Sequence, residues 1–273
     1  MTISENTQND IFRNAVEALK DPLPQRVWSV IVSLFGDLAQ GEGDQISGVA
    51  LTEVAGLIGI RAEAIRVALH RLRKEGWIDS IREGRSSQHQ LTQKGRQDTV
   101  SATPRIYARN AQSNGTWRIA CAEDDAGLNK IKQPQTGYIA LSRRVALIAD
   151  YGIALPPDLL VFQANSDVVP RWMQDRICPP DLTEAAATLE HALLKSNALI
   201  RDAANFDPVQ RAAMRTLIVH RWRRVVLRIP DLPNMFFPPD WPGETCRRLT
   251  FDLLDQLPTP TLSELETSVA QRR

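Results

Sequence analysis

The feature that most constrains this chain is a series of three short helical patterns near its N-terminus. The first begins near Pro24 and ends near Leu38, with apolar residues at spacings of three and four, which predicts one buried face. A shorter helix is expected from Leu51 to Leu57, with Thr52 as its N-cap. A third is expected from Ala62 to Lys74, and Gly76 follows it as a C-cap.

Two strand-like runs follow the third helix. They cover residues 77–82 and 87–92, and Gly84, Arg85 and Ser86 lie between them as the tip of a hairpin. The order helix, helix, turn, helix, hairpin is typical of a winged helix-turn-helix, a DNA-binding unit. The sequence therefore predicts that unit at the N-terminus.

Basic residues concentrate in this part of the chain. Residues 61–96 contain nine Lys and Arg and four acids, a local net charge of +5, whereas the whole chain carries only +1. A local field governs a charged contact more than the total charge does. The same charges are also compatible with a plain solvated helix face, but their place on the third helix and the hairpin favours contact with double-stranded DNA.

The third helix separates into two faces when Ile65, Leu69 and Leu72 point inward. Arg66 is then the best base-reading candidate, because its guanidinium fits guanine O6 and N7. Arg61, Arg71, Arg73 and Lys74 are interpreted as phosphate contacts, and His70 as a phosphate contact or a plain surface residue. Arg85 at the hairpin tip is expected either in a minor groove or against the DNA backbone. The predicted DNA-binding residues are Arg61, Glu63, Arg66, Val67, His70, Arg71, Arg73, Lys74, Arg85 and Ser86.

The middle of the chain predicts a small α+β unit. After a break at residues 101–104, a strand is expected from Thr116 to Ala122 and a helix from Gly137 to Tyr151. A second strand is expected from Leu159 to Gln163. From Leu182 onward the pattern is mainly helical.

A second basic stretch runs from Arg211 to Arg228 and contains six arginines and no acid. One interpretation is a site for an anionic ligand, because the guanidinium fork suits phosphate. The other is a helix whose arginines pair with acids elsewhere in the fold, and this second interpretation is favoured.

Other features argue against an enzyme, a membrane protein and a disulfide scaffold. The three cysteines are scattered, which fits a reducing cytoplasm, and no spacing suggests a metal site. No apolar run is long enough to span a membrane, and no catalytic motif appears. Asp124 and Asp125 suit a metal, but an acidic turn is the commoner explanation. No cofactor is expected.

Short segments near both ends of the chain carry a family resemblance. They are Ser33-Leu-Phe-Gly-Asp37, Ala64-Ile-Arg-Val-Ala-Leu-His-Arg-Leu72, Glu75-Gly-Trp77, Gly84-Arg85-Ser86, Leu91-Thr92, Gly95-Arg96, Trp222-Arg-Arg224, Arg228, Leu232-Pro233 and Phe237-Pro-Pro-Asp-Trp-Pro-Gly243. Together they resemble the PaaX family of phenylacetic acid degradation transcriptional repressors. The string from Asp240 to Gly243 is the most specific of them.

The resemblance implies an α+β protein with an N-terminal winged helix-turn-helix, a central ferredoxin-like domain and a C-terminal helical domain. The expected ranges are a flexible lead-in at 1–20, then domains at 21–100, 101–180 and 181–273. A homodimer on a palindromic operator is also implied. So is release by an aryl-CoA thioester, such as phenylacetyl-CoA or another aryl- or acyl-CoA. The candidate effector-binding residues are Arg223, Arg224, Arg228, Trp222 and Trp241.

The chain departs from the family pattern at two places. Arg228-Ile229-Pro230 stands where members usually have Arg-Asp-Pro, and residues 165–201 show little likeness. The effector of this chain can therefore differ from the effector of the family members. Two rival functions come from other classes: a metal-dependent nuclease built on the central domain, with Asp124 or Asp125 as ligand, and an interaction module that binds protein through its C-terminal helices.

Overall fold

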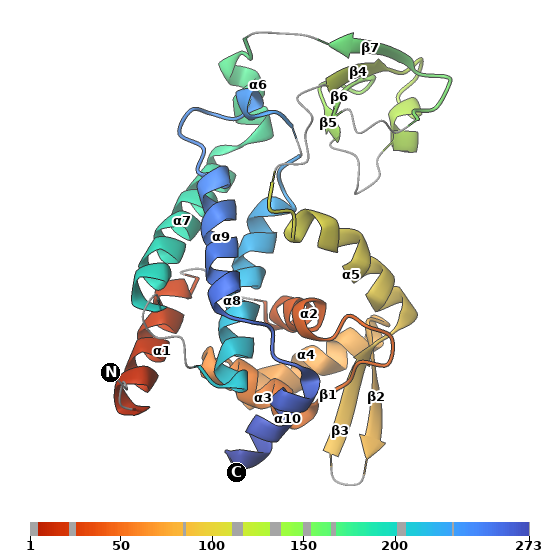
Figure 1. Ribbon diagram of the computed structural model, residues 1–273. Helices are drawn as coiled ribbons and strands as arrows, with labels where there is room; N and C mark the ends of the chain where they lie inside the picture. The colour runs from red at the N-terminus through yellow and green to blue at the C-terminus, as the bar shows by residue number, and fades with distance from the viewer. Residues whose placement is uncertain are drawn as a thin grey trace.

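The computed structural model describes residues 5–21, 26–83, 86–110, 117–131, 138–149, 154–164, 168–200, 206–230 and 232–272. Long helices form the body of the molecule, with a three-stranded antiparallel sheet at one end and a four-stranded antiparallel sheet at the other (Figure 1). The α+β class is confirmed.

The N-terminal segment is a helix, α1 (Glu5–Leu19), and the expected flexible lead-in at 1–20 is wrong over this range. Its apolar residues Phe12, Ala15, Val16 and Leu19 recur at helical spacing and are buried. The helix packs along α7 (Pro180–Ile200). The many polar residues that suggested a disordered segment occupy the exposed face.

Three helices follow: α2 (Val27–Leu38), α3 (Gly48–Leu57) and α4 (Ala62–Lys74). The bounds of α4 are those expected from the sequence. The cap of α3 is Ser47, whose Oγ accepts a hydrogen bond from the backbone N–H of Ala50 at 3.0 Å. Thr52 is not a cap, because its hydroxyl donates to the carbonyl of Gly48 within the helix.

The smaller sheet contains β1 (Ile46–Ser47), β2 (Ile78–Glu83) and β3 (Ser86–Leu91) in the order β1-β3-β2. The β2–β3 hairpin follows α4 directly, as expected. Gly84 and Arg85 at its tip lie outside the described residues, as does the side chain of Ser86.

Helix α5 (Gln93–Ile106) runs through the segment in which a break was expected. Thr92 caps its start by accepting from the N–H of Gly95 at 3.0 Å. Pro104 lies in the last turn, where a missing N–H removes one intrahelical hydrogen bond without ending the helix. The break predicted at 101–104 is therefore wrong.

The larger sheet contains β4 (Trp117–Cys121), β5 (Tyr138–Ala140), β6 (Val145–Ala149) and β7 (Leu160–Ala164) in the order β5-β6-β4-β7. A 3-10 helix, η1 (Gly127–Ile131), lies between β4 and β5. The two strands expected in this region, near 116–122 and 159–163, are confirmed to within one residue.

The helix expected at 137–151 is wrong, because β5 and β6 form an antiparallel pair there. Each half, 138–141 and 145–149, is a short continuous apolar run, a pattern that a buried strand shares with a buried helix segment. The polar residues at 142–144 form the bend between the halves. Periodicity alone therefore could not separate two strands from one helix in this segment.

The C-terminal part is mainly helical, as expected, and α7 and α8 run beside α9 (Figure 1). Its further elements are α6 (Arg171–Ile177), α8 (Pro208–Val226), η2 (Asn234–Phe236), α9 (Gly243–Gln256) and α10 (Leu262–Gln271). Asp207 caps α8 with a reciprocal capping box to Gln210.

One hydrophobic core joins the two ends of the sequence. Helix α2 packs on α8, and buried residues from α1 to β3 belong to the same cluster as those of α7 to α10. A smaller cluster lies on one face of the larger sheet. The N-terminal helices therefore depend on the C-terminal helices for much of their burial. Among the described helices, none is both long and apolar enough to cross a bilayer.

The burial of α1 gives a first prediction. Phe12 packs edge-on against Phe206, with ring centroids 5.4 Å apart. Phe12→Ala is expected to lower the free energy of unfolding by about 3–5 kcal/mol, because it opens a cavity between α1 and the core. Asn14→Ala on the exposed face of the same helix is the control. Urea unfolding measures both, and an unchanged midpoint for Phe12→Ala would contradict the packing of α1.

Candidate DNA interface

Helix α4 has a buried and an exposed face. Ile65, Ala68, Leu69 and Leu72 are buried, and the helix packs on α2 and α3. Gly76 has a φ of +70°, a left-handed conformation that lets the chain leave the helix at once toward β2. The inward stripe expected from the sequence is thus confirmed.

The outward face carries the predicted residues. All eight on α4 and its N-cap are exposed: Arg61, Glu63, Arg66, Val67, His70, Arg71, Arg73 and Lys74. Val67 is 70% exposed, although it is apolar. Their exposure is as expected, whereas their contact with DNA stays a prediction.

Two arginines on this face have partners within the protein. Arg66 forms an ion pair of 2.8 Å with Glu63, and both side chains are exposed, so the pair contributes little to stability. Arg71 is held more firmly, since its Nε lies 2.7 Å from Glu75 Oε1 and its guanidinium lies 4.7 Å from the ring centroid of Trp28. Arg71 therefore also links α4 to α2.

Other basic residues of this region hold the fold together. Lys94 donates to the carbonyl of Glu75 at the end of α4, and Arg96 donates to the carbonyl of Gly41. In the hairpin, His89 is buried and its Nδ1 lies 2.7 Å from Ser80 Oγ. Burial, with Arg73 nearby, lowers the pKa of His89. Lys94 and Arg96 thus stabilise the fold through contacts with backbone carbonyls.

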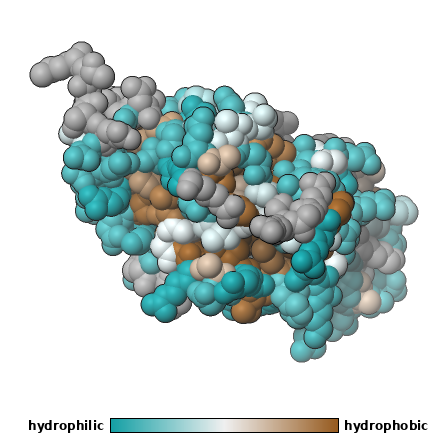
Figure 2. Space-filling view, turned by 90° about the horizontal axis from the view of Figure 1, so that it is seen from below, coloured by the Kyte–Doolittle hydropathy of each residue, from teal (hydrophilic) through white to brown (hydrophobic). Residues whose placement is uncertain are grey.

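The end of the molecule that carries α3 and the hairpin is seen in Figure 2. Hydrophilic residues cover much of this face, and hydrophobic residues show in patches between them. A surface that approaches a phosphate backbone is expected to be largely hydrophilic.

Sequence reasoning missed a contact from the last helix. Glu266 of α10 accepts from both the N–H and the Oγ of Ser47 at 2.8 Å each, at the start of α3. This carboxylate joins the C-terminal helix to the residue at which β1 ends and α3 begins. The contact spans more than 200 residues of sequence, so local pattern has no means of finding it.

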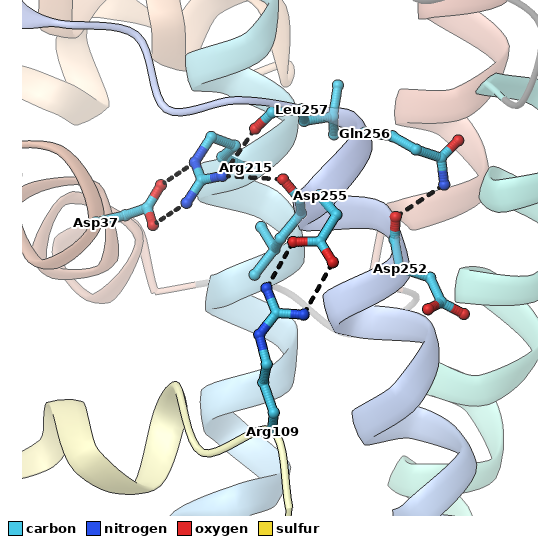
Figure 3. A network of polar contacts seen from close by, with 8 residues as sticks. Asp37, Arg109, Arg215, Asp252, Asp255, Gln256 and Leu257 are labelled. Atoms are coloured by element: carbon cyan, nitrogen blue, oxygen red, sulfur yellow. Dashed lines mark hydrogen bonds and ion pairs between the residues drawn. The ribbon is translucent and has the colours of Figure 1, made fainter.

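A buried ion pair connects α2 to the C-terminal helices (Figure 3). Arg215 of α8 donates from Nε and Nη2 to the two oxygens of Asp37 at 2.7 and 2.8 Å. The side chains are only 8% and 1% exposed. Arg215 also donates to the carbonyls of Leu254 and Leu257 at the end of α9.

Further polar contacts surround this pair. The hydroxyl of Tyr107 donates to Asp37 at 2.6 Å, and burial beside that carboxylate raises the pKa of Tyr107 well above its usual range. Arg109 forms a two-pronged contact with Asp255 of α9. The residues after α5 are therefore fastened to both α2 and α9.

The second basic stretch forms one side of a groove of about 820 Å³ between α2, α7 and α8. Arg221, Arg223, Arg224 and Arg228 line it, facing Asp21, Asp181 and Glu184. Arg224 pairs with Asp21, and Arg228 lies 2.6 Å from Asp181. The favoured interpretation, arginines paired with acids elsewhere, is confirmed for these two.

Two predicted effector residues lie apart from the groove. Trp222 has no exposed surface, and its Nε1 donates to the carbonyl of Ile106 at 2.8 Å. Trp241 stacks on Phe237 at 5.8 Å and does not line the groove. Assigning Trp222 to a ligand was wrong, because its ring is fully buried in the core and its N–H already has an acceptor within the protein.

The acidic pair at 124–125 is a turn. Asp124 Oδ1 accepts from the N–H groups of Ala126 and Gly127, and Asp125 pairs with Arg144 at 2.9 Å. Within the described ranges, no group of three or more His, Cys, Asp or Glu is placed to hold a metal ion.

Both ends of the chain match models of one protein family. The PaaX-like protein family model matches residues 26–95, and the PaaX-like protein C-terminal domain model matches residues 181–264. The transcriptional repressor PaaX of Escherichia coli strain K12 is 29% identical over 271 residues, which cover 89% of this chain and 85% of that protein. The chain belongs to the PaaX family.

A solved structure shows a related fold. The uncharacterised protein Rv0674 from Mycobacterium tuberculosis aligns with a TM-score of 0.50 and 19% identity, covering 89% of this chain and 97% of that one. In this PaaX-family chain, the two matched segments hold α2 to β3 and α7 to α9, the elements that share the core and both members of the Asp37–Arg215 pair.

A buried histidine gives a test of how α2 meets α8. His220 Nδ1 lies 3.1 Å from Ser33 Oγ, and Arg223 also donates to that hydroxyl at 3.0 Å. Burial, with Arg223 and Arg224 nearby, lowers the pKa of His220 to about 3. The unfolded chain takes up this proton below about pH 6.5 and the folded chain does not, so stability falls as the pH drops below that value.

His220→Asn is expected to remove this dependence. Between pH 7.5 and 5.5 the variant should lose about 1.4 kcal/mol less free energy of unfolding than the wild type, one pKa unit of linkage. Urea unfolding at both pH values measures the difference, with His191→Asn at an exposed position as the control. Equal losses in His220→Asn and the wild type would show that His220 takes up its proton in the folded chain as readily as in the unfolded chain.

Proposed function

We propose that this PaaX-family chain is a DNA-binding transcriptional repressor that places the outward face of α4 in the major groove. The observation that carries the proposal is this face itself, exposed along its whole length and rich in Arg and Lys, beside a hairpin. The name of the Escherichia coli relative supports the same role. The chain is a regulator rather than an enzyme.

The N-terminal unit is proposed as a winged helix-turn-helix, with α3 and α4 as the motif and the β2–β3 hairpin as the wing. The central unit is proposed as ferredoxin-like. Numbered along the chain, its strands lie in the order second, third, first, fourth, which that fold requires. It departs from the ideal in its helices: η1 replaces the first, and residues 154–159 of the second link form none.

The roles of the site residues follow from their placement. Arg66 is proposed to read a guanine, because its partner Glu63 is exposed and easily exchanged for a base edge. Arg61, Arg73 and Lys74 are proposed to contact phosphates, with Arg85 and Ser86 at the wing tip. His70 is proposed as a further contact to the phosphate backbone of the DNA. Arg71 orients α4 through Trp28 as well as approaching the backbone.

The operator and the assembly are proposed from the family resemblance. A homodimer that presents two copies of α4 fits a palindromic site, with half-sites about one helical turn apart. The regulated genes are proposed to be an aromatic-acid catabolic operon of the phenylacetate type. The cytoplasm is the proposed location.

The arginine groove is the proposed effector site. Its arginines suit the phosphates of an aryl-CoA or acyl-CoA thioester, and its size is ordinary for a small-molecule site. Bound phosphates would compete with Asp21 for Arg224 and with Asp181 for Arg228. Arg223 donates to Ser29 and Ser33 of α2, which packs on α4. A ligand here therefore has a short path to the DNA-binding face.

Arg66 gives the test of DNA binding. Arg66→Ala is expected to weaken binding to a duplex selected by the wild type from a random-sequence library by about 1–3 kcal/mol. Fluorescence anisotropy measures the affinity, with Arg248→Ala on α9 as the control, because the Arg248 side chain is 61% exposed, against 71% for Arg66, but lies on another element. Wild-type affinity should fall steeply with salt. Unchanged affinity for Arg66→Ala would remove this residue from the interface.

Arg228 gives the test of the groove. Phenylacetyl-CoA is expected to raise the melting temperature of the wild type, because a ligand of the folded state stabilises it. Arg228→Met should bind this probe about tenfold more weakly, through loss of a charge-assisted hydrogen bond. Arg248→Met is the control. Equal affinity of the two variants for the probe would place the effector elsewhere.

A further inference from the structure

We infer that Val67 reads the 5-methyl group of a thymine in the major groove and so helps to set the operator sequence. The inference rests on the proposed function, because it needs α4 to lie in that groove. It adds a specific base preference to a site whose other contacts are mostly ionic.

The first observation is that Val67 is exposed for no structural reason. The side chain is 70% exposed at the middle of α4. A β-branched apolar residue is not favoured on a solvated helix surface, since it has neither good helix propensity nor a hydrogen-bonding group for water. The core of this region is filled by the opposite face, through Ile65, Leu69 and Leu72.

The second observation is that most of the side chains around Val67 on α4 are charged or polar. Its neighbours one turn away on the helix are Glu63, His70 and Arg71, all exposed, and Arg66 precedes it. The remaining neighbour one turn away is Ala64, a small and half-buried side chain, so no large apolar side chain of α4 adjoins Val67 on this face. Of the other exposed apolar side chains, Ile81 lies on β2 of the hairpin, whereas Leu160, Phe162 and Trp172 lie on β7 and α6. On the outward face of α4, Val67 is therefore the one large apolar side chain among charged and polar ones, which does not suit a hydrophobic protein contact.

The chemistry of the major groove supplies a matching group. Each base pair there presents donors and acceptors, and only thymine adds a methyl group. An isopropyl side chain forms no hydrogen bond, so the favourable contact open to Val67 is apolar burial against that methyl. Because Arg66 and Val67 are adjacent in sequence, the thymine is expected close to the guanine that Arg66 contacts.

The experiment removes the methyl group alone. In a duplex selected by the wild type from a random-sequence library, each thymine is replaced in turn by deoxyuridine, which keeps base pairing and lacks only the methyl. For the wild type, one position in each half-site should weaken binding about three- to fivefold, the effect of losing one buried methyl-sized group. For Val67→Ala, the same replacement should change affinity by less than about 1.5-fold, since its partner is gone.

Val100→Ala is the matched control, because Val100 is also an exposed valine, 51% accessible, on α5. It should keep the full wild-type response to deoxyuridine. Thermal unfolding checks that both variants fold. If no thymine is sensitive in the wild type, or if Val67→Ala is as sensitive as the wild type at every position, the inference is wrong. If the wild type selects no duplex at all, the proposed function itself fails.

Discussion

The buried pair between Asp37 and Arg215 is the contact on which the arrangement of this molecule depends. It fixes the end of α2 against α8, and Arg215 at the same time holds the carbonyls at the end of α9. Removing one partner of such a pair typically costs about 3–5 kcal/mol, because the other charge is left buried without compensation. The two segments matched by the family models thus meet at one specific point within a shared core.

Helix α2, which this pair holds against α8, contacts both proposed binding regions. One side packs on α4, which presents the proposed DNA-binding face, and Trp28 contributes to that packing by lying under Arg71. Another part of α2, at Ser29 and Ser33, accepts hydrogen bonds from Arg223 of the groove. The proposed DNA face and the proposed effector groove therefore share a single helix. We propose that a change in the arginine contacts would act first on α2 and through it on α4.

The sequence predicted the local features of this account well. The bounds of α4, its buried stripe and its exposed cationic face all follow from helical spacing, because an amphipathic helix of this length carries its own signal. The β2–β3 hairpin follows from its turn residues. The family resemblance also came from short motifs, and the Asp240–Gly243 string is one of them.

The failures share a physical cause, namely dependence on distant partners. Residues of α1 look solvated until α7 supplies the surface that buries Phe12. Trp222 looks like a ligand-stacking residue among arginines until Ile106 appears as its hydrogen-bond acceptor. Glu266 reaches Ser47 only in the folded chain. The segment 138–149 is apolar on both sides of a short polar bend, and only the pairing of β5 with β6 distinguishes two strands from one helix.

The shared core and the Asp37–Arg215 pair make α2, α4 and the C-terminal helices one cooperative unit. Native-state hydrogen exchange on the full chain tests this cooperativity, since it reports the opening free energy of each amide. The slowest amides of α2 and α4 are expected to open with the same free energy as those of α8, and Asp37→Asn is expected to lower all three together. Opening of α2 and α4 at a much lower free energy, unaffected by Asp37→Asn, would contradict it.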